Sequence, residues 1–295
     1  MRACTIFGPG SSQRDLRVFR NVPGISWQME PPSLKDGADV ILLFGGDGTL
    51  HRHLARLVEL QLPLLVVPRG SGNDFARSLG LRGMNDSLAA WQKFVSGAGH
   101  VRPVDVGVIK ALESARQPST SQEHYFGTVA GVGLDGEIAR RANHLPRWFR
   151  GNGGYALTLL PTLFRFAALP MKIALTGKTA DSSPRDDFQF TVLAAFANVP
   201  TFGGGMKIAP QARFDDGELD VCIIRDIDKF KLFCLFPTVY FGRHLRMKEV
   251  EYSRAVSVRV ETEYPLDVYA DGEYVCRTPI EVSLKRNALR VIVPE

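Results

Sequence analysis

The sequence lacks the long apolar runs of an integral membrane protein. A membrane-spanning helix needs roughly 18–20 consecutive apolar residues, and the nearest approach, residues 155–169, is interrupted by Pro161 and Arg165. The shares of hydrophobic residues (45%) and charged residues (23%) are those of an ordinary globular protein. We therefore exclude a protein that is built into the bilayer.

The chain also has little cysteine. Its four cysteines form no Cys-x-x-Cys pair, and neither they nor the six histidines show metal-ligand spacing. No Ser/His/Asp arrangement of a hydrolase is present, and no signal-peptide pattern is seen. From these absences we expect a reducing, cytoplasmic setting.

No large excess of charge of one sign is present either. The net charge is +5 and the pI is about 9.1. This mild basic excess suits nucleotides or an acidic membrane surface as partners, but it is too small to indicate nucleic acid. A Gly-x-x-x-x-Gly-Lys-[Ser/Thr] motif is missing, which excludes a P-loop enzyme.

What the sequence does contain is a glycine-rich stretch, Gly45-Gly46-Asp47-Gly48-Thr49, after an apolar strand at 40–44 and before a helix that we expect from Leu50. Glycines let a backbone approach a bulky anion, and the first amides of a helix favour phosphate. A bare carboxylate repels phosphate unless Mg²⁺ or a proton intervenes, so we interpret Asp47 as an acid that acts on a bound nucleotide. A tight turn without ligand is the alternative.

A second loop, Gly70-Ser71-Gly72-Asn73-Asp74, follows a strand at 64–67 and opens another helix. Two strand–loop–helix units predict an α/β domain with a parallel sheet, whose ligands bind beyond the carboxyl ends of the strands. Ser71 can donate a hydrogen bond to phosphate, and Asn73 can bind phosphate or ribose oxygens. We expect Asp74 to be the N-cap of the following helix.

The pattern changes near Val101 to short strands separated by turns, which predicts a largely antiparallel β-sandwich or barrel. We therefore predict an α/β nucleotide-binding domain at 1–104 and a β-rich domain at 105–295. Whether a final strand near 286–295 packs back on the first domain is left open.

Of three motifs in the β-rich part, the first two have two interpretations each and the third is a hairpin on sequence alone. The run Gly131-Val132-Gly133-Leu134-Asp135-Gly136 lacks the acidic residue of a dinucleotide site, so it is a plain turn or it places Asp135 in the cleft between domains. The acids at 215–216 are typical of a solvated turn, although oxygen-rich turns also hold Mg²⁺. Asp271-Gly272-Glu273 carries the usual hairpin signal.

The segment 230–248 interleaves aromatic and basic side chains. Such a pattern suits an interfacial helix on anionic lipid. A helix that covers the β-rich domain, with its cations in solvent, is the slightly favoured alternative.

Taken together, these motifs resemble the diacylglycerol kinase catalytic-domain family, which comprises soluble bacterial lipid kinases and the related sphingosine and ceramide kinases. The resemblance covers nearly the whole chain and rests on five motifs in the family's order and separations: residues 45–49, 68–77, 131–135, 209–220 and 271–273.

The resemblance implies an N-terminal domain like that of phosphofructokinase and NAD kinase, followed by a β domain, with ATP between them. It implies Mg²⁺-dependent transfer of the γ-phosphate of ATP to a lipid hydroxyl at a membrane surface, by a protein in peripheral contact with the membrane. Residues 45–51 would line the phosphates, and Ser71 stands where threonine is usual. A homodimer is left open.

The resemblance also implies roles for individual residues. The general base would be Asp271 or Glu273, whereas sphingosine kinases give that role to the aspartate that matches Asp47. A structural Mg²⁺ would be held by three groups: the carboxylate of Asp216 and the main-chain carbonyls of Arg213 and Glu218.

Two departures from the family pattern keep rival functions in view. The opening loop is Gly-Pro-Gly-Ser-Ser at 8–12 instead of Asn-Pro-x-x-Gly, and the segment before the central strand is short. Both bear on adenine and ribose contacts. The alternatives are an NAD kinase-like enzyme and a catalytically weak nucleotide- or lipid-binding protein.

Overall fold

The structure, a computed structural model, describes residues 1–29, 37–113, 122–134, 136, 162–163, 166–177 and 187–294. Backbone contacts divide the chain into two units. Unit 1 comprises residues 1–106 and 285–295, and unit 2 comprises residues 107–284. The chain passes from one unit to the other within strands β5 (His100–Ala111) and β15 (Ile280–Val293).

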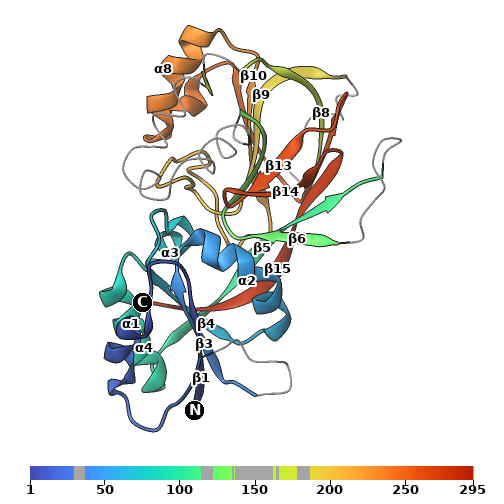
Figure 1. Ribbon diagram of the computed structural model, residues 1–295. Coiled ribbons are helices and arrows are strands. Elements are labelled where there is room, and N and C mark those ends of the chain that lie inside the picture. The colour runs from blue at the N-terminus through green and yellow to red at the C-terminus, as the bar shows by residue number, and fades with distance from the viewer. Residues whose placement is uncertain are drawn as a thin grey trace. The chain divides into compact units, whose positions relative to one another are not determined.

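Unit 1 is built on a parallel sheet in the order β15-β4-β3-β1-β2 (Figure 1). The new strands are β1 (Arg2–Phe7), β2 (Ser26–Gln28), β3 (Val40–Gly45) and β4 (Pro63–Pro68). All six residues of β3 are buried, because a central parallel strand is covered on both faces and therefore reads as one apolar run.

Helices lie on both sides of this sheet (Figure 1). They are α1 (Gln13–Leu16), the 3₁₀ helix η1 (Arg17–Asn21), α2 (Asp47–Leu60), α3 (Asp74–Ser78) and α4 (Met84–Val95). Helix α2 buries Leu50, Leu54 and Leu57, the apolar face at helical spacing. It begins three residues before the predicted start, so Asp47, Gly48 and Thr49 of the glycine stretch lie in the first helical turn.

Unit 2 is dominated by antiparallel pairing. Its strands follow the order β14-β13-β7-β9-β8-β12-β15, with β10 between β9 and β11, and with β5 paired to β6 and β15. They are β6 (Glu123–Phe126), β7 (Val129–Gly133), β8 (Leu169–Thr176), β9 (Gln189–Ala197), β10 (Leu219–Arg225), β11 (Val250–Ala255), β12 (Ser257–Thr262), β13 (Asp267–Ala270) and β14 (Glu273–Arg277).

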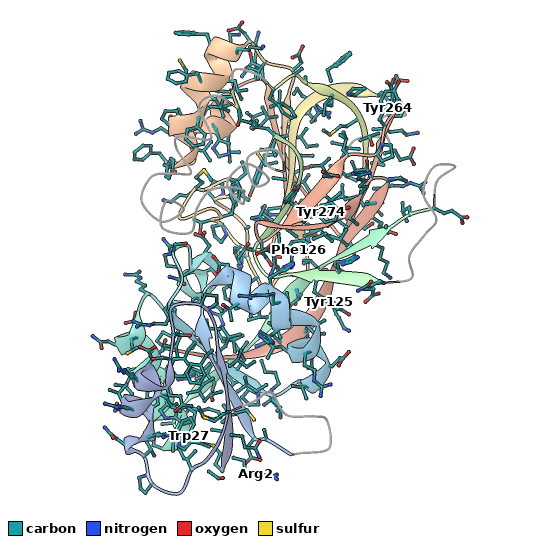
Figure 2. All side chains as sticks on the ribbon, in the orientation of Figure 1. Arg2, Trp27, Tyr125, Phe126, Tyr264 and Tyr274 are labelled. Carbon is teal, nitrogen blue, oxygen red and sulfur yellow. The ribbon has the colours of Figure 1, made fainter. Side chains whose placement is uncertain are left out.

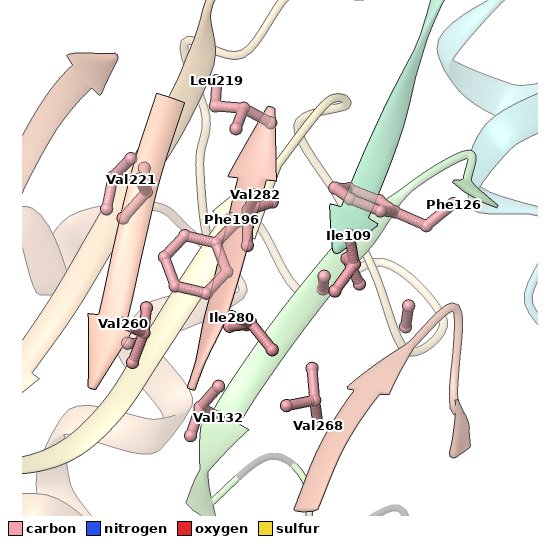
Figure 3. Close-up of a cluster of buried hydrophobic side chains, with 14 of the residues drawn as sticks. Ile109, Phe126, Val132, Phe196, Leu219, Val221, Val260, Val268, Ile280 and Val282 are labelled. Carbon is pink, nitrogen blue, oxygen red and sulfur yellow. The ribbon is translucent and has the colours of Figure 1, made fainter. Parts of the chain in front are cut away.

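Strand β9 separates two apolar cores. Successive side chains of a strand point to opposite faces, and β9 sends Phe196 into one core and Ala195 into the other. Figure 3 shows Phe196 among Val221, Val260 and Val282 in the first core. Because both faces are covered, the last seven residues of β9 are all buried.

The second core lies under helix α8 (Lys229–Val239), which is followed by the 3₁₀ helix η2 (Arg243–Arg246). The Asp228 side chain caps α8 by accepting hydrogen bonds from the amides of Phe230 (2.9 Å) and Lys231 (3.3 Å). No helix in the described ranges is long and apolar enough to cross a membrane.

Candidate functional site

The two predicted glycine loops touch each other at the carboxyl ends of β3 and β4. The Arg69 amide donates to the Gly45 carbonyl oxygen (3.0 Å). A Cβ atom on Gly46 would lie 2.7 Å from the Gly70 Cα, and one on Gly70 would lie 2.6 Å from the Gly46 Cα. Two backbones can meet at this distance only when both residues are glycine.

A third loop, which follows β1, joins the same edge of the sheet. The Gly8 amide donates to the Phe44 carbonyl oxygen (2.8 Å), and the Ser11 hydroxyl donates to the same carbonyl oxygen (2.8 Å) and to that of Gly8 (2.7 Å). The buried Thr49 side chain fills the space that a Cβ would need on Gly8 or Gly45. The serine of the unusual opening loop therefore ties that loop to the central strand.

Asp47 links the first loop to the second. Its Oδ2 accepts a hydrogen bond from the Asp74 amide (2.9 Å), and its Oδ1 accepts one from the Phe75 amide (3.1 Å). These are the first two amides of α3. The prediction that Asp74 is the N-cap was wrong: Asn73 occupies that position without a capping bond, and Asp47 satisfies the amides from another loop.

Asn73 acts within its own loop. It adopts the left-handed conformation (φ +54°), which asparagine tolerates better than most residues. Its Oδ1 accepts from the Gly70 amide (2.9 Å) and its Nδ2 donates to the Gly70 carbonyl oxygen (2.7 Å). The predicted binding residues at 45–49 and 70–73 are thus brought together, and the Ser71 side chain stays exposed.

We expect Asp47→Asn to lower the free energy of unfolding by about 1–2 kcal/mol, because an NH₂ group would face one α3 amide. We also expect ATP binding to weaken, since the second loop is no longer held. Urea unfolding and calorimetric titration with ATP measure the two effects.

Asp86→Asn is the matched control. One Asp86 oxygen accepts from the amides of Arg82 (2.9 Å) and Gly83 (3.1 Å), which belong to neither glycine loop. This variant should lose comparable stability and keep ATP affinity. Equal losses of ATP affinity in both variants would contradict the role given to Asp47.

In unit 2, Asp271 and Gly272 form the two-residue turn between β13 and β14. Both have positive φ (+52° and +83°), as a type I′ hairpin turn requires. The hairpin prediction from this dipeptide therefore matches the local geometry. Glu273, the first residue of β14, is exposed.

The Asp271 carboxylate is bound to the segment that connects β6 to β7. It accepts from the Gly127 amide (2.9 Å), from the Thr128 amide (2.8 Å) and from the Thr128 hydroxyl. Buried Asn198 supports the same segment, with its Nδ2 donating to the Gly127 carbonyl oxygen (3.1 Å). Sequence reasoning missed these partners, because no motif marks them.

Two carboxylates near the start of β10 each have a buried oxygen: Asp216, in the loop before the strand, and Asp220, within it. Asp216 Oδ1 accepts from the Glu218 amide (3.1 Å), whereas its Oδ2 is buried with no hydrogen-bond partner among the described residues. Asp220 is fully buried and accepts from the Tyr252 hydroxyl, and its Oδ2 likewise has no described partner. Burial raises the pKa of Asp220, and the bond from Tyr252 opposes that rise.

Two further predicted site residues, Arg213 and Asp135, remain. Arg213 is exposed, and its Nε donates to Asp215 (3.3 Å). Asp135, the predicted substrate residue, lies outside the described residues. In the part of the chain that the structure describes, no three His, Cys, Asp or Glu side chains form a metal-binding group.

Comparison with known proteins identifies the family. The family model of the diacylglycerol kinase catalytic domain matches residues 32–109, and that of the YegS C-terminal NAD kinase beta sandwich-like domain matches residues 128–293. A diacylglycerol kinase of Mycobacterium tuberculosis (strain ATCC 25618 / H37Rv) is 35% identical over 258 residues, which cover 88% of this chain and 78% of that protein. The chain belongs to the diacylglycerol kinase catalytic-domain family.

Other relatives agree with this membership. A diacylglycerol kinase of Bacillus subtilis (strain 168) is 27% identical over 261 residues, covering 87% of this chain and 78% of that protein. A crystal structure from Bacillus anthracis str. Sterne has the same fold, with a TM-score of 0.71 at 23% identity over 99% of this chain and 96% of that one.

The comparisons confirm two predictions made from the motifs. The diacylglycerol kinase family is the one that the five motifs resemble. The predicted fold class, a parallel α/β part followed by a β-sandwich part, is also correct. The names of the relatives support a lipid kinase.

Proposed function

We propose that this protein is a lipid kinase that transfers the γ-phosphate of ATP to a hydroxyl group of a diacylglycerol-like lipid. The observation that carries the proposal is the contact between the two glycine loops at the carboxyl ends of β3 and β4. Ligands of parallel α/β sheets bind at this edge. Phosphoryl transfer needs positioning and charge neutralisation more than covalent chemistry, and rigid glycine loops supply positioning.

In this proposal residues 45–51 and 70–73 bind the phosphates of ATP. Main-chain amides of glycine-rich turns favour anions. The exposed Ser71 hydroxyl donates a further hydrogen bond to phosphate. Asp47 acts in this proposal as a positioning residue, since its carboxylate holds the second loop through the first two amides of α3.

The Asp271-Gly272-Glu273 turn supplies the general base, which takes the proton from the lipid hydroxyl during attack. The two carboxylates of this turn differ in setting. Three hydrogen bonds orient Asp271, whereas the Glu273 side chain is exposed. Replacing Asp271 and Glu273 one at a time therefore tests which of the two carboxylates the reaction needs.

Mg²⁺ fits two places in this proposal. Bound to ATP, it neutralises the charge of the β- and γ-phosphates. A structural ion fits the loop at 213–218, because the buried Asp216 Oδ2 has no described hydrogen-bond partner and oxygen is the ligand that Mg²⁺ prefers. The carbonyls of Arg213 and Glu218, with water, would complete that site.

We expect Mg²⁺ to raise the melting temperature of the unmodified protein in the absence of nucleotide, by about 2–5 °C at tenfold excess over its dissociation constant. Asp216→Asn should abolish this shift, and the neighbouring Asp215→Asn should keep it. Scanning calorimetry with and without EDTA measures the effect. An unchanged Mg²⁺ shift in Asp216→Asn would remove this residue from the site.

The activity is tested by following labelled γ-phosphate from ATP–Mg²⁺ into a diacylglycerol in mixed micelles, with a parallel reaction that contains NAD in place of lipid. Label in phosphatidate is the expected result. Label in NADP would instead assign an NAD kinase. Bound ATP with no labelled product from any lipid would favour a nucleotide-binding protein without turnover.

A further inference from the structure

Helix α8 is apolar on both of its faces. One face buries Leu232, Leu235 and Val239 in the second core of unit 2. The other face leaves Phe230 70% exposed, and Phe241, just after the helix, is 72% exposed. A helix that is apolar on both faces is normally enclosed by protein or lipid, and the residues that the structure describes leave Phe230 and Phe241 largely uncovered.

The exposed side chains form one continuous stripe. Phe230, Cys234 and Pro237 are exposed, at the spacings i, i+4 and i+7 that share one helix face, and exposed Phe241 follows just after the helix. The Asp228 cap fixes the start of the helix. The stripe is therefore held in place and not formed by a loose loop.

Cations adjoin the C-terminal end of this stripe. The segment 240–248 contains Arg243, Arg246 and Lys248 and no acidic residue, and all three basic side chains are exposed. At the other end, Lys229 is exposed as well, and Lys231 pairs with Glu249 (3.1 Å). Aromatic side chains beside exposed bases match the acyl and headgroup layers of an anionic bilayer.

The charge favours a bilayer over a second copy of the chain. An isologous dimer through this end of the face would bring two sets of the same exposed cations close together, and the adjacent acid, Glu249, is already paired with Lys231. Figure 1 shows α8 at the edge of unit 2, next to β10.

We propose that the stripe of α8, together with the cations of 243–248, docks unit 2 onto an anionic lipid bilayer. The role of this contact rests on the proposed lipid-kinase function, since an enzyme that phosphorylates a membrane lipid must work at the bilayer surface. Vesicle binding itself can be measured without any phosphorylation.

The chain provides a reporter at the centre of the stripe. Cys234 is exposed, whereas Cys4, Cys222 and Cys276 are buried, so a polarity-sensitive maleimide dye labels Cys234 selectively. We expect a blue shift of the dye with vesicles of phosphatidylcholine that contain phosphatidylglycerol, and little change with phosphatidylcholine alone. Co-sedimentation of unlabelled protein with the same vesicles gives the affinity.

Variants test the two components separately. Phe230→Ala with Phe241→Ala should weaken vesicle binding by at least about tenfold. Replacing Arg243, Arg246 and Lys248 by glutamine should weaken it by roughly 100-fold at low salt. The control is Tyr264→Ala, which removes an aromatic ring that is 67% exposed elsewhere in unit 2 (Figure 2); its binding should not change.

Three results would overturn the docking surface: equal binding to neutral vesicles, unchanged binding of both variants, or a concentration-dependent dimer that the Phe230→Ala/Phe241→Ala protein loses. Phosphorylation of a short-chain, monomeric diacylglycerol separates docking from catalysis. Vesicle binding without phosphorylation of any lipid would defeat the proposed function and leave the docking surface standing. Normal turnover of the short-chain lipid by the docking variants would support both.

Discussion

Asp271→Asn is expected to lower kcat by roughly 10²–10⁴-fold, the range for loss of an acid–base group or of its positioning. It should also lower the free energy of unfolding by about 2–3 kcal/mol, because an amide NH₂ would face a donor of Gly127 or Thr128. Asparagine tolerates the positive φ of this position, so the turn itself is not strained. Steady-state kinetics and urea unfolding measure the two effects.

Glu273→Gln is the matched variant in the same turn. Its side chain is exposed, so stability should stay within about 0.5 kcal/mol of the unmodified protein. A large loss of kcat in this variant alone would make Glu273 the base, and a loss only in Asp271→Asn would exclude Glu273 from that role. Unchanged turnover in both would remove the turn from the mechanism.

Gly70→Ala is the second change with a large expected effect. The added Cβ would lie 2.6 Å from the Gly46 Cα, which is backbone and cannot rotate away as a side chain can. The loops must separate, which should cost about 3 kcal/mol of stability and reduce ATP affinity by more than about tenfold. Urea unfolding and calorimetric titration with ATP measure these losses.

Gly83→Ala controls for the general effect of replacing glycine. Gly83 is extended (φ −164°) at the start of α4, and an added Cβ meets nothing within 4 Å. Stability should change by less than about 1 kcal/mol, and ATP affinity should not change. ATP binding by Gly70→Ala as tight as that of Gly83→Ala would show that the contact between the loops is not needed.

The two motif aspartates have the same local role in different units. Asp47 binds the first amides of α3, and Asp271 binds the amides before β7. Each carboxylate holds a neighbouring loop at the end of a strand. If replacing either aspartate lowers activity, the stability of the variant must therefore be measured as well before a chemical role is assigned to the residue.

Much of the fold could be predicted from local pattern. The buried run of β3, the apolar spacing of α2 and the Asp271-Gly272 hairpin each follow from neighbouring residues. Strand, glycine loop and helix, repeated once, were enough to predict the parallel sheet. These features depend on interactions within a few residues, which a sequence displays directly.

The sequence did not determine which partner each polar side chain binds. It marked Asp47 as an acid near phosphate and Asp74 as a helix cap, but the folded chain makes Asp47 the group that binds the α3 amides. It left α8 with two interpretations, and the structure shows an exposed apolar stripe beside its buried face.

The sequence by itself determined the family and the two kinds of sheet. Only the tertiary structure decided that Gly46 and Gly70 are in contact and which amides each carboxylate binds. The reason is physical: the bond from Asp74 to Asp47 joins residues 27 positions apart, and that from Thr128 to Asp271 joins residues 143 apart. Such contacts leave no periodicity in a sequence, because they form only when separate loops meet at the ends of packed strands.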